Sequence, residues 1–343
     1  MEEENVDYSG MSIEEKVKHF EDTVVQSPLF TEILKRIDEC RLRAKYTTEP
    51  RGIIVTGDTG YGKTTIGRFY EKDYPRAVGD DGTIIPVLLS SVPSPATIKG
   101  MGSSLLRDMG DPLWDRGTTG NITGRLCNFI KKCKVELIIL DEFQDLIDKD
   151  TEKVLRSCAD WLKHILNDTG VPMVLMGMPW AADILNVNSQ LERRFSTRMA
   201  LKAFGWSTEE QQNEFTGFLI MLEKGLLFPA PSTLYSGEMP FRLFCATRGV
   251  VSNIKNLISK AAERGFERGS GCITIDLLAL AYDEELAHDG LGKINPFRVD
   301  AETLTIPPDP APKEPTRGVG AGNRGRRKSN AKANGKISTH LHK

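Results

Sequence analysis

Eight residues at Gly57–Thr64, GDTGYGKT, combine three glycines with a lysine and a threonine at fixed spacing. They match GxxxxGKS/T, a loop whose glycines let the backbone curl until its N–H groups face an anion. In such a loop the lysine reaches the β and γ phosphates of a nucleotide, and the threonine binds Mg²⁺. We therefore predict a nucleotide phosphate site formed by Gly57, Asp58, Thr59, Gly60, Tyr61, Gly62, Lys63, Thr64 and Thr65.

An acidic pair, Asp141 and Glu142, closes the apolar run Val135–Leu140. In phosphate-loop sites the aspartate of such a pair holds Mg²⁺, and the glutamate orients and polarises the attacking water. We predict Thr64 and Asp141 as metal ligands, and Glu142 together with Lys63 as catalytic groups. The alternative for Asp141 is a helix N-cap, and the two roles are compatible. A phosphate loop paired with these acids favours hydrolysis over binding alone.

Two arginines, Arg193 and Arg194, lie in LERRFSTR after the predicted fourth strand. In a ring or filament, an arginine there can reach the γ-phosphate bound to a neighbouring subunit and stabilise the charge that develops during transfer. We predict that one of the two has this catalytic role. The alternative is a solvated helix face or a local salt bridge, because arginine pairs on helices are common.

Strand and helix patterns alternate around these residues. The β-rich run RGIIVTG precedes the loop, and a helical pattern follows it. Further strands are predicted at Thr83–Ser90, Val135–Leu140, Val171–Met176 and near Thr197–Ala203, with helices at Ser94–Met109, Ile122–Lys134 and Thr151–Asp168. Continuous apolar strands separated by helices predict an α/β fold with a parallel sheet sandwiched by helices.

The chain divides into four predicted regions. Ser12 and Glu15 in capping-box spacing, then Pro28, predict N-terminal helices within residues 1–50. Residues 51–206 form the α/β nucleotide-binding core, and 207–289 have the spacing of a small helical lid. Residues 290–343 are Pro-rich and then basic, with too few apolar residues to fold alone, so we expect a disordered tail. Eight Lys/Arg and no Asp/Glu lie in residues 317–343, which suggests a separate electrostatic partner or an inert solubilising end.

The composition is that of a soluble globular protein, with 39% hydrophobic and 27% charged residues and a net charge of −2. No apolar run approaches a membrane span of about 20 residues, and the acidic start lacks the features of a secretory signal. We therefore expect a cytoplasmic protein without a membrane partner. The six cysteines lack CxxC spacing and are predicted to be reduced thiols packed as small apolar groups.

Four segments then occur in an informative order: SPLFTEILKRIDEC, LIILDEFQDL, VPMVLMGMPWAADIL and QLERRFSTRMALKAFGW. Together they resemble the TniB/TnsC group, AAA+ regulators of transposition in mobile elements, over roughly Val24–Trp206. The phosphate loop and the Asp-Glu pair are shared by all AAA+ proteins. The more particular signals are DEFQDL, the Gly-Met-Pro after the fourth strand, and QLERRF followed by a tryptophan.

The resemblance implies an AAA+ P-loop ATPase that uses ATP and Mg²⁺ as an adaptor. Relatives form homo-oligomeric rings or helical filaments around double-stranded DNA, receive a TniQ-like target-selection protein, and recruit a transposase. Some of them serve CRISPR-associated transposons. The implied place of action is the bacterial cytosol, in association with the nucleoid.

Two departures from the AAA+ pattern concern sensor residues. Gly177-Met178-Pro179 stands where many relatives carry a polar residue after the fourth strand. The lid's usual sensor arginine has only loose candidates here, in Arg248, Asn253 and Lys255. Both departures fit slow hydrolysis, with ATP used mainly as an assembly switch.

The resemblance also implies a DNA-contacting region between the second and third core strands. Lys99 lies at a predicted helix position, and Arg116, Thr118 and Thr119 lie in a predicted loop. Lysine and arginine neutralise phosphates, and threonine hydroxyls fix register without reading sequence. The alternative is an ordinary surface helix and loop.

Two other functions share the nucleotide site. A replication-type AAA+ helicase loader or origin-binding ATPase usually has a polar sensor and often a winged-helix DNA reader, and neither is evident. A STAND-type nucleotide signalling switch normally has appended sensor or repeat domains. The segment after the lid is too short to contain them. The regulator of transposition is therefore the leading hypothesis.

Overall fold

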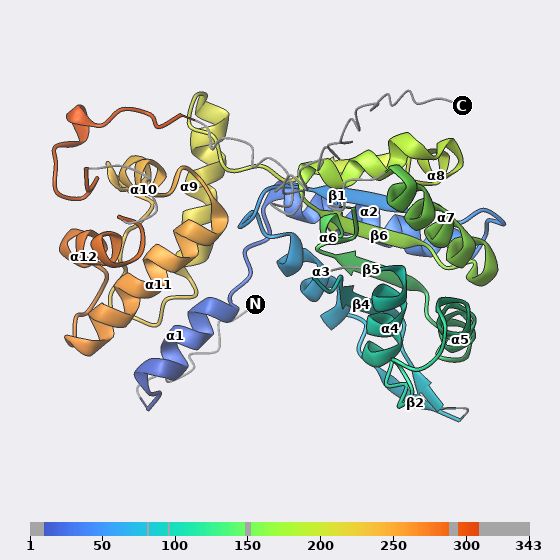
Figure 1. Cartoon of the computed structure of the whole chain (residues 1–343). Helices are drawn as coiled ribbons and strands as arrows, with labels where there is room; N and C mark the ends of the chain where they lie inside the picture. Colours follow the sequence, from blue (N-terminus) through green and yellow to red (C-terminus); the bar gives the residue numbers. More distant parts are fainter. Residues whose placement is uncertain (1–9, 81, 95–96, 148–151, 288–293, 309–343) are drawn as a thin grey trace, which may run out of the picture.

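The computed structural model describes residues 10–80, 82–94, 97–147, 152–287 and 294–308 (Figure 1). Five parallel strands form its main sheet, in the order β4-β5-β6-β1-β7. Their bounds are β1 (Ile53–Thr56), β4 (Val87–Ser91), β5 (Leu137–Asp141), β6 (Met173–Gly177) and β7 (Thr197–Ala200). A separate antiparallel hairpin consists of β2 (Ala77–Gly79) and β3 (Gly82–Ile84).

Helices cover both faces of this sheet because its strands are apolar on both sides. Alternate residues point to opposite faces of a strand, so Ile54 of β1 packs into one core and its neighbours Ile53 and Val55 into another. The first core contains α4 (Ile98–Asp108), α5 (Thr119–Lys132), α7 (Glu152–Thr169), η1 (Pro179–Val187) and α8 (Ser189–Arg194). The second contains α2 (Pro28–Ala44) and α3 (Lys63–Lys72). The predicted parallel sheet sandwiched by helices is confirmed.

A helical lid follows the sheet and has a core of its own (Figure 1). It contains α9 (Glu209–Glu223), α10 (Met239–Thr247), α11 (Val251–Glu267) and α12 (Ile275–Glu285). Trp206 lies at its entrance, where its ring stacks on Phe244 with centroids 5.4 Å apart. The helical character predicted for this region is confirmed, and within the described residues no helix is long and apolar enough to cross a bilayer.

The first helix of the chain packs on this lid and not on the sheet. In α1 (Ile13–Asp22), Ser12 and Glu15 form the predicted capping box, and Phe20 is buried in the lid core. The chain then crosses to the sheet, where Ser27 caps α2 and Pro28 occupies its first turn. The two helices of residues 1–50 therefore belong to different packing units, a separation that the sequence pattern does not reveal.

The lid also continues beyond residue 289. Phe297 is buried in the lid core, and the Arg242 guanidinium donates to the carbonyls of Pro296 and Val299 at 2.6 Å. The short η2 (Ala301–Thr303) follows. Residues 294–308, which sequence composition assigned to a disordered tail, are thus held against the lid. The basic part of the tail, residues 317–343, lies outside the described residues.

The predicted strand Thr83–Ser90 is wrong in part, because the structure divides it. Its first residues form β3, which turns back on β2, and only β4 joins the main sheet. Pro86 separates them: it cannot donate a ladder hydrogen bond, but its carbonyl accepts from the N–H groups of Glu136 and Leu137. Three short elements of the core were not predicted, namely β2, α6 (Gln144–Ile147) and η1, whereas the helix expected to carry Arg193 and Arg194 is present as α8.

All six cysteines are free thiols, as expected. Burial raises the pKa of the Cys158 thiol to about 11, which keeps it protonated at neutral pH.

A buried guanidinium ties α2 to α3 and to the segment before β5. Arg41, 8% exposed, donates to Glu136 at 2.5 Å, to Asp38 at 2.9 Å, and to the hydroxyls of Tyr70 and Tyr74 at 2.9 Å each. Burial acts to raise the pKa of both carboxylates, but the bonds from Arg41 and its neighbours outweigh it and lower each pKa.

Replacing Arg41 by methionine should reduce the free energy of unfolding by about 3 kcal/mol, because the carboxylates lose a shared buried partner. Groups with lowered pKa stabilise the fold above their ordinary pKa, so this difference should shrink as the pH falls below about 4. Denaturant unfolding of wild type and variant at several pH values measures it. Arg36→Met is the matched control, because its ion pairs with Glu32 and Glu39 are exposed and should contribute less than about 1 kcal/mol. Equal effects of the two variants would contradict this account.

Candidate nucleotide site

The phosphate loop lies between the end of β1 and the start of α3. Gly60 and Gly62 have φ values of +86° and +96°, a region that residues with a side chain rarely adopt. Gly62 caps α3, so the N–H groups of the first helical turn point into the loop. The glycine spacing in GDTGYGKT thus corresponds to an actual backbone requirement at two of its three positions.

Parallel pairing brings the acidic pair to this loop. The carboxyl ends of β1, β5 and β6 share one edge of the sheet, with Thr56 beside Gly177. Thr64 Oγ1 donates to Asp141 Oδ2 at 2.5 Å, and Lys63 Nζ donates to the carbonyls of Gly57 and Asp58 at 2.6 and 3.0 Å. Asp141 is 4% exposed, and this burial raises its pKa despite the bond from Thr64.

Glu142 follows in a left-handed conformation, with φ +53°. Such a φ is uncommon for a residue with a side chain and marks a position that its surroundings impose. The side chain lines the same cleft as Lys63 and Thr64, and its Oε2 accepts from Gln144 Nε2 at 2.5 Å. The structure therefore brings together four sequence-predicted residues: Lys63, Thr64, Asp141 and Glu142.

The donor set here fits Mg²⁺. A hydroxyl and a carboxylate, Thr64 and Asp141, offer hard oxygen ligands, and Mg²⁺ typically takes few protein ligands beside substrate phosphates and water. No group of three or more His, Cys, Asp or Glu side chains that could hold a metal occurs in the part of the chain that the structure describes. When bound, Mg²⁺ would neutralise phosphate charge; Thr64 and Asp141 would hold it.

The lid closes the cleft from the opposite side. The Ser252 N–H at the start of α11 donates to the Gly60 carbonyl at 3.0 Å. The approach is so close that a Cβ on Gly60 would stand 2.2 Å from Ser252 Oγ. Two constraints therefore favour glycine at position 60, namely its positive φ and its close contact with the lid.

Lys255 is the lid cation that faces this cleft. It lines both the phosphate cleft and the adjoining apolar cavity, and its Nζ donates to the carbonyls of Glu21 and Thr23 at 2.7 and 2.9 Å. Burial lowers its pKa. The other two loose sensor candidates serve the lid itself: Arg248 caps α10 with φ +53°, and Asn253 Nδ2 donates to the Thr247 carbonyl at 3.5 Å.

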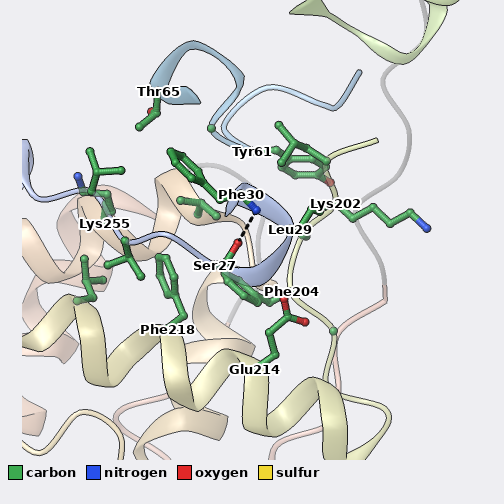
Figure 2. A pocket seen from close by; sticks show the side chains of 18 of the residues that line it. Ser27, Leu29, Phe30, Tyr61, Thr65, Lys202, Phe204, Glu214, Phe218 and Lys255 are labelled. Carbon is green, nitrogen blue, oxygen red and sulfur yellow. Dashed lines mark hydrogen bonds between the residues drawn. The ribbon is translucent and has the colours of Figure 1, made fainter. Parts of the chain in front are cut away.

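An apolar cavity of about 350 Å³ adjoins the loop and was not foreseen from the sequence (Figure 2). Rings of Phe30, Tyr61, Phe204 and Phe218 surround it, from α2, the phosphate loop, the segment after β7 and α9. Its size and apolar walls beside a phosphate site suit a planar base. Of these four, only Tyr61 lay in the predicted site, because the others come from three separate segments.

The two arginines of α8 differ in their surroundings. Arg194 donates to the Pro50 carbonyl at 3.3 Å and to Asn167 at 2.8 Å, so it helps hold its own subunit together. Arg193 is exposed and makes no ion pair within the described residues. Of the two, Arg193 is thus the side chain available to another molecule.

The residues predicted to contact DNA are all exposed and belong to α4, α5 and the loop between them. Lys99 is in the first turn of α4, and Thr118 caps α5, directly before Thr119. Arg125 organises this loop, because its guanidinium forms a 2.7 Å ion pair with buried Asp111 and also donates to the carbonyls of Leu113 and Arg116. No sequence motif singles out Arg125.

Comparison with known proteins identifies the family. The profile of the family described as "Bacterial TniB protein" matches residues 17–206, more than half of the chain. The chain belongs to the TniB family. A search of curated proteins gave no match.

Solved structures show how this TniB-family chain is folded. The ORC2 protein of Aeropyrum pernix, in ADPNP-ADP complexes, has 16% identity and a TM-score of 0.55, over 79% of this chain and 72% of that one. The ORC1 protein of Aeropyrum pernix in complex with DNA has 15% identity and a TM-score of 0.56, over 78% and 69%. Cdc6p of Pyrobaculum aerophilum has 14% identity and a TM-score of 0.56, over 78% and 70%. The TniB-family chain thus has the AAA+ P-loop fold, which confirms the resemblance found in the sequence.

Replacing Tyr61 by alanine should weaken ATP binding about 3- to 10-fold, the loss expected when an aromatic contact with the base is removed. It should leave the binding of inorganic tripolyphosphate unchanged. Lys63→Ala should weaken the binding of both ligands, because the Lys63 ammonium binds the phosphates. Calorimetric titration of both ligands into each variant measures this, with Tyr46→Ala as control because Tyr46 is 90% exposed and lines neither part of the site. Equal loss for both ligands in Tyr61→Ala would place the base elsewhere.

Proposed function

We propose that this TniB-family protein is an ATP-dependent, DNA-binding regulator of transposition. It assembles on double-stranded DNA and links a TniQ-like target-selection protein to a transposase. The observation that carries the proposal is the composite nucleotide site of Lys63, Thr64, Asp141 and Glu142 at one sheet edge in a TniB-family chain. ATP with Mg²⁺ is the cofactor that this site fits.

The proposed reaction is slow hydrolysis of ATP to ADP and phosphate. Lys63 and the loop N–H groups bind the phosphates, and Glu142 orients and polarises the attacking water. No polar side chain follows β6, because Gly177 and Met178 occupy that place. Hydrolysis is therefore proposed to reset an assembly and not to drive a fast motor.

Assembly is proposed to supply an arginine that a single subunit lacks at its own nucleotide site. Arg193 is exposed at the end of α8, and we propose that it reaches the γ-phosphate bound by a neighbouring subunit. Arg194, bonded to Pro50 and Asn167, is assigned a structural role. We therefore propose Arg193, and not Arg194, as the arginine that acts on a neighbouring subunit.

DNA is proposed to contact the exposed surface of Lys99, Arg116, Thr118 and Thr119. These side chains suit phosphates and not base edges, so the contact is independent of sequence. The net charge of −2 does not oppose this, because a local basic stripe is sufficient. Support by analogy comes from the ORC1 protein, whose structure was determined in complex with DNA.

A replication-type loader is the second candidate, and the likeness to ORC and Cdc6 proteins favours it. At identities of 14–16% that likeness concerns the fold. The TniB-family match is specific to the sequence of the core, so the regulator of transposition is preferred.

Electron microscopy with a long DNA duplex and a nonhydrolysable ATP analogue tests the proposal. We expect continuous nucleotide-dependent filaments, and fewer of them with a Lys99→Ala, Arg116→Ala double variant at rising salt. Lys131→Ala, at the far end of α5 and paired with Asp168, is the control. Closed rings that load a helicase would favour the replication candidate, and the absence of DNA-dependent assembly would refute both.

Mixing variants tests the role of Arg193. Because an arginine supplied in trans contributes about 10³-fold or more to kcat, Arg193→Ala and Glu142→Gln should each reduce hydrolysis to background. A mixture of the two should recover activity, since an intact Glu142 in one subunit meets an intact Arg193 from the next. Arg194→Ala should lower the unfolding temperature and gain nothing from mixing with Glu142→Gln. Recovery with Arg194→Ala in place of Arg193→Ala would reverse the assignment.

A further inference from the structure

A single buried amide joins Glu142 to the end of β6. Gln144, 7% exposed, donates through Nε2 to Glu142 Oε2 at 2.5 Å, and its Oε1 accepts from the Met178 N–H at 3.0 Å. The backbone N–H of Met178 can only donate, so it fixes which end of the amide carries the oxygen. The NH₂ group must then face Glu142.

The residue at the end of β6 is small because this amide occupies the space. A Cβ on Gly177 would stand 2.8 Å from Gln144 Oε1 and 2.9 Å from the Cβ of Ala181. Any larger residue would displace the amide or the first turn of η1. Gly177 and Gln144 are therefore complementary, and together they place a polar group between the ends of β5 and β6.

We propose that Gln144 is a positioning residue that holds the Glu142 carboxylate toward the phosphate cleft. Its bond engages Oε2 and leaves Oε1 for the water that Glu142 is proposed to polarise. The left-handed backbone of Glu142 turns the side chain into the cleft, and Gln144 fixes its remaining rotation. This inference rests on the proposed hydrolysis of ATP.

A purely structural role for Gln144 predicts a different response to an isosteric change. In Gln144→Glu the shape and the acceptor for Met178 remain, but the donor to Glu142 is replaced by a second carboxylate. A carboxylate cannot donate to Glu142 Oε2 and repels it, so the positioning role predicts a loss of kcat without a matching loss of ATP affinity. Loss of packing alone would instead lower the unfolding temperature and the ATP affinity together.

The experiment compares steady-state ATP hydrolysis and unfolding temperature of full-length wild type, Gln144→Glu and Gln144→Met at pH 7. Both variants should lower kcat about 10- to 100-fold at pH 7 with less than twofold change in the KM for ATP, because a misplaced catalytic group costs about 10²-fold. Gln144→Met carries no buried charge and retains the test if Gln144→Glu does not fold. Gln190→Glu, on exposed α8, is the control.

Wild-type kcat in both variants would overturn the positioning role. So would a parallel loss of ATP affinity and unfolding temperature, because that is the result of a structural role. A wild type that binds ATP without hydrolysing it would instead refute the proposed function, and this inference with it. The two failures are therefore distinguishable.

Discussion

The nucleotide site depends on one constraint of the sheet, the placement of β1 between β6 and β7. Paired on both sides, β1 delivers the phosphate loop at the carboxyl edge of the sheet, where β5 also ends. Parallel strands put all their carboxyl ends there, so residues far apart in sequence meet: Thr64 and Asp141 are bonded although 77 positions separate them. Without that register neither Asp141 nor Glu142 would face the loop.

The lid is also connected to this edge of the sheet. The Ser252 N–H bonds Gly60, and Lys255 bonds the last carbonyls of α1, so the lid touches the phosphate loop and the N-terminal helix at once. Lysine is well suited to this, because its ammonium can bond several carbonyls and its pKa shifts readily on burial. The N-terminal helix is thereby attached to the unit that contacts the nucleotide site.

Much of this arrangement could be predicted from the sequence, and the limits have physical causes. The phosphate loop, the Asp141-Glu142 pair and the parallel sheet follow from local patterns: glycine spacing, strand-end acids and apolar runs. The apolar cavity could not be predicted, since Phe30, Phe204 and Phe218 come from segments that only the tertiary fold brings together. The predicted strand Thr83–Ser90 is divided at Pro86, and this could not be predicted because the β2–β3 hairpin is too short to show a periodic pattern. Gln144 belongs to the DEFQDL motif, but its partner Met178 is 34 positions away, so this contact could not be predicted.

The cavity between sheet and lid is lined by the segments that connect these two units. The chain passes between the two units twice, at residues 23–27 and at residues 201–208. Both crossings also form walls of the cavity, the first through Thr23, Val24, Val25 and Ser27, the second through Leu201–Gly205 (Figure 2). Any rotation of the lid relative to the sheet would bend these two connections. A ligand seated in the cavity would contact both of them, and would thereby link occupancy of the cavity to the position of the lid and of α1.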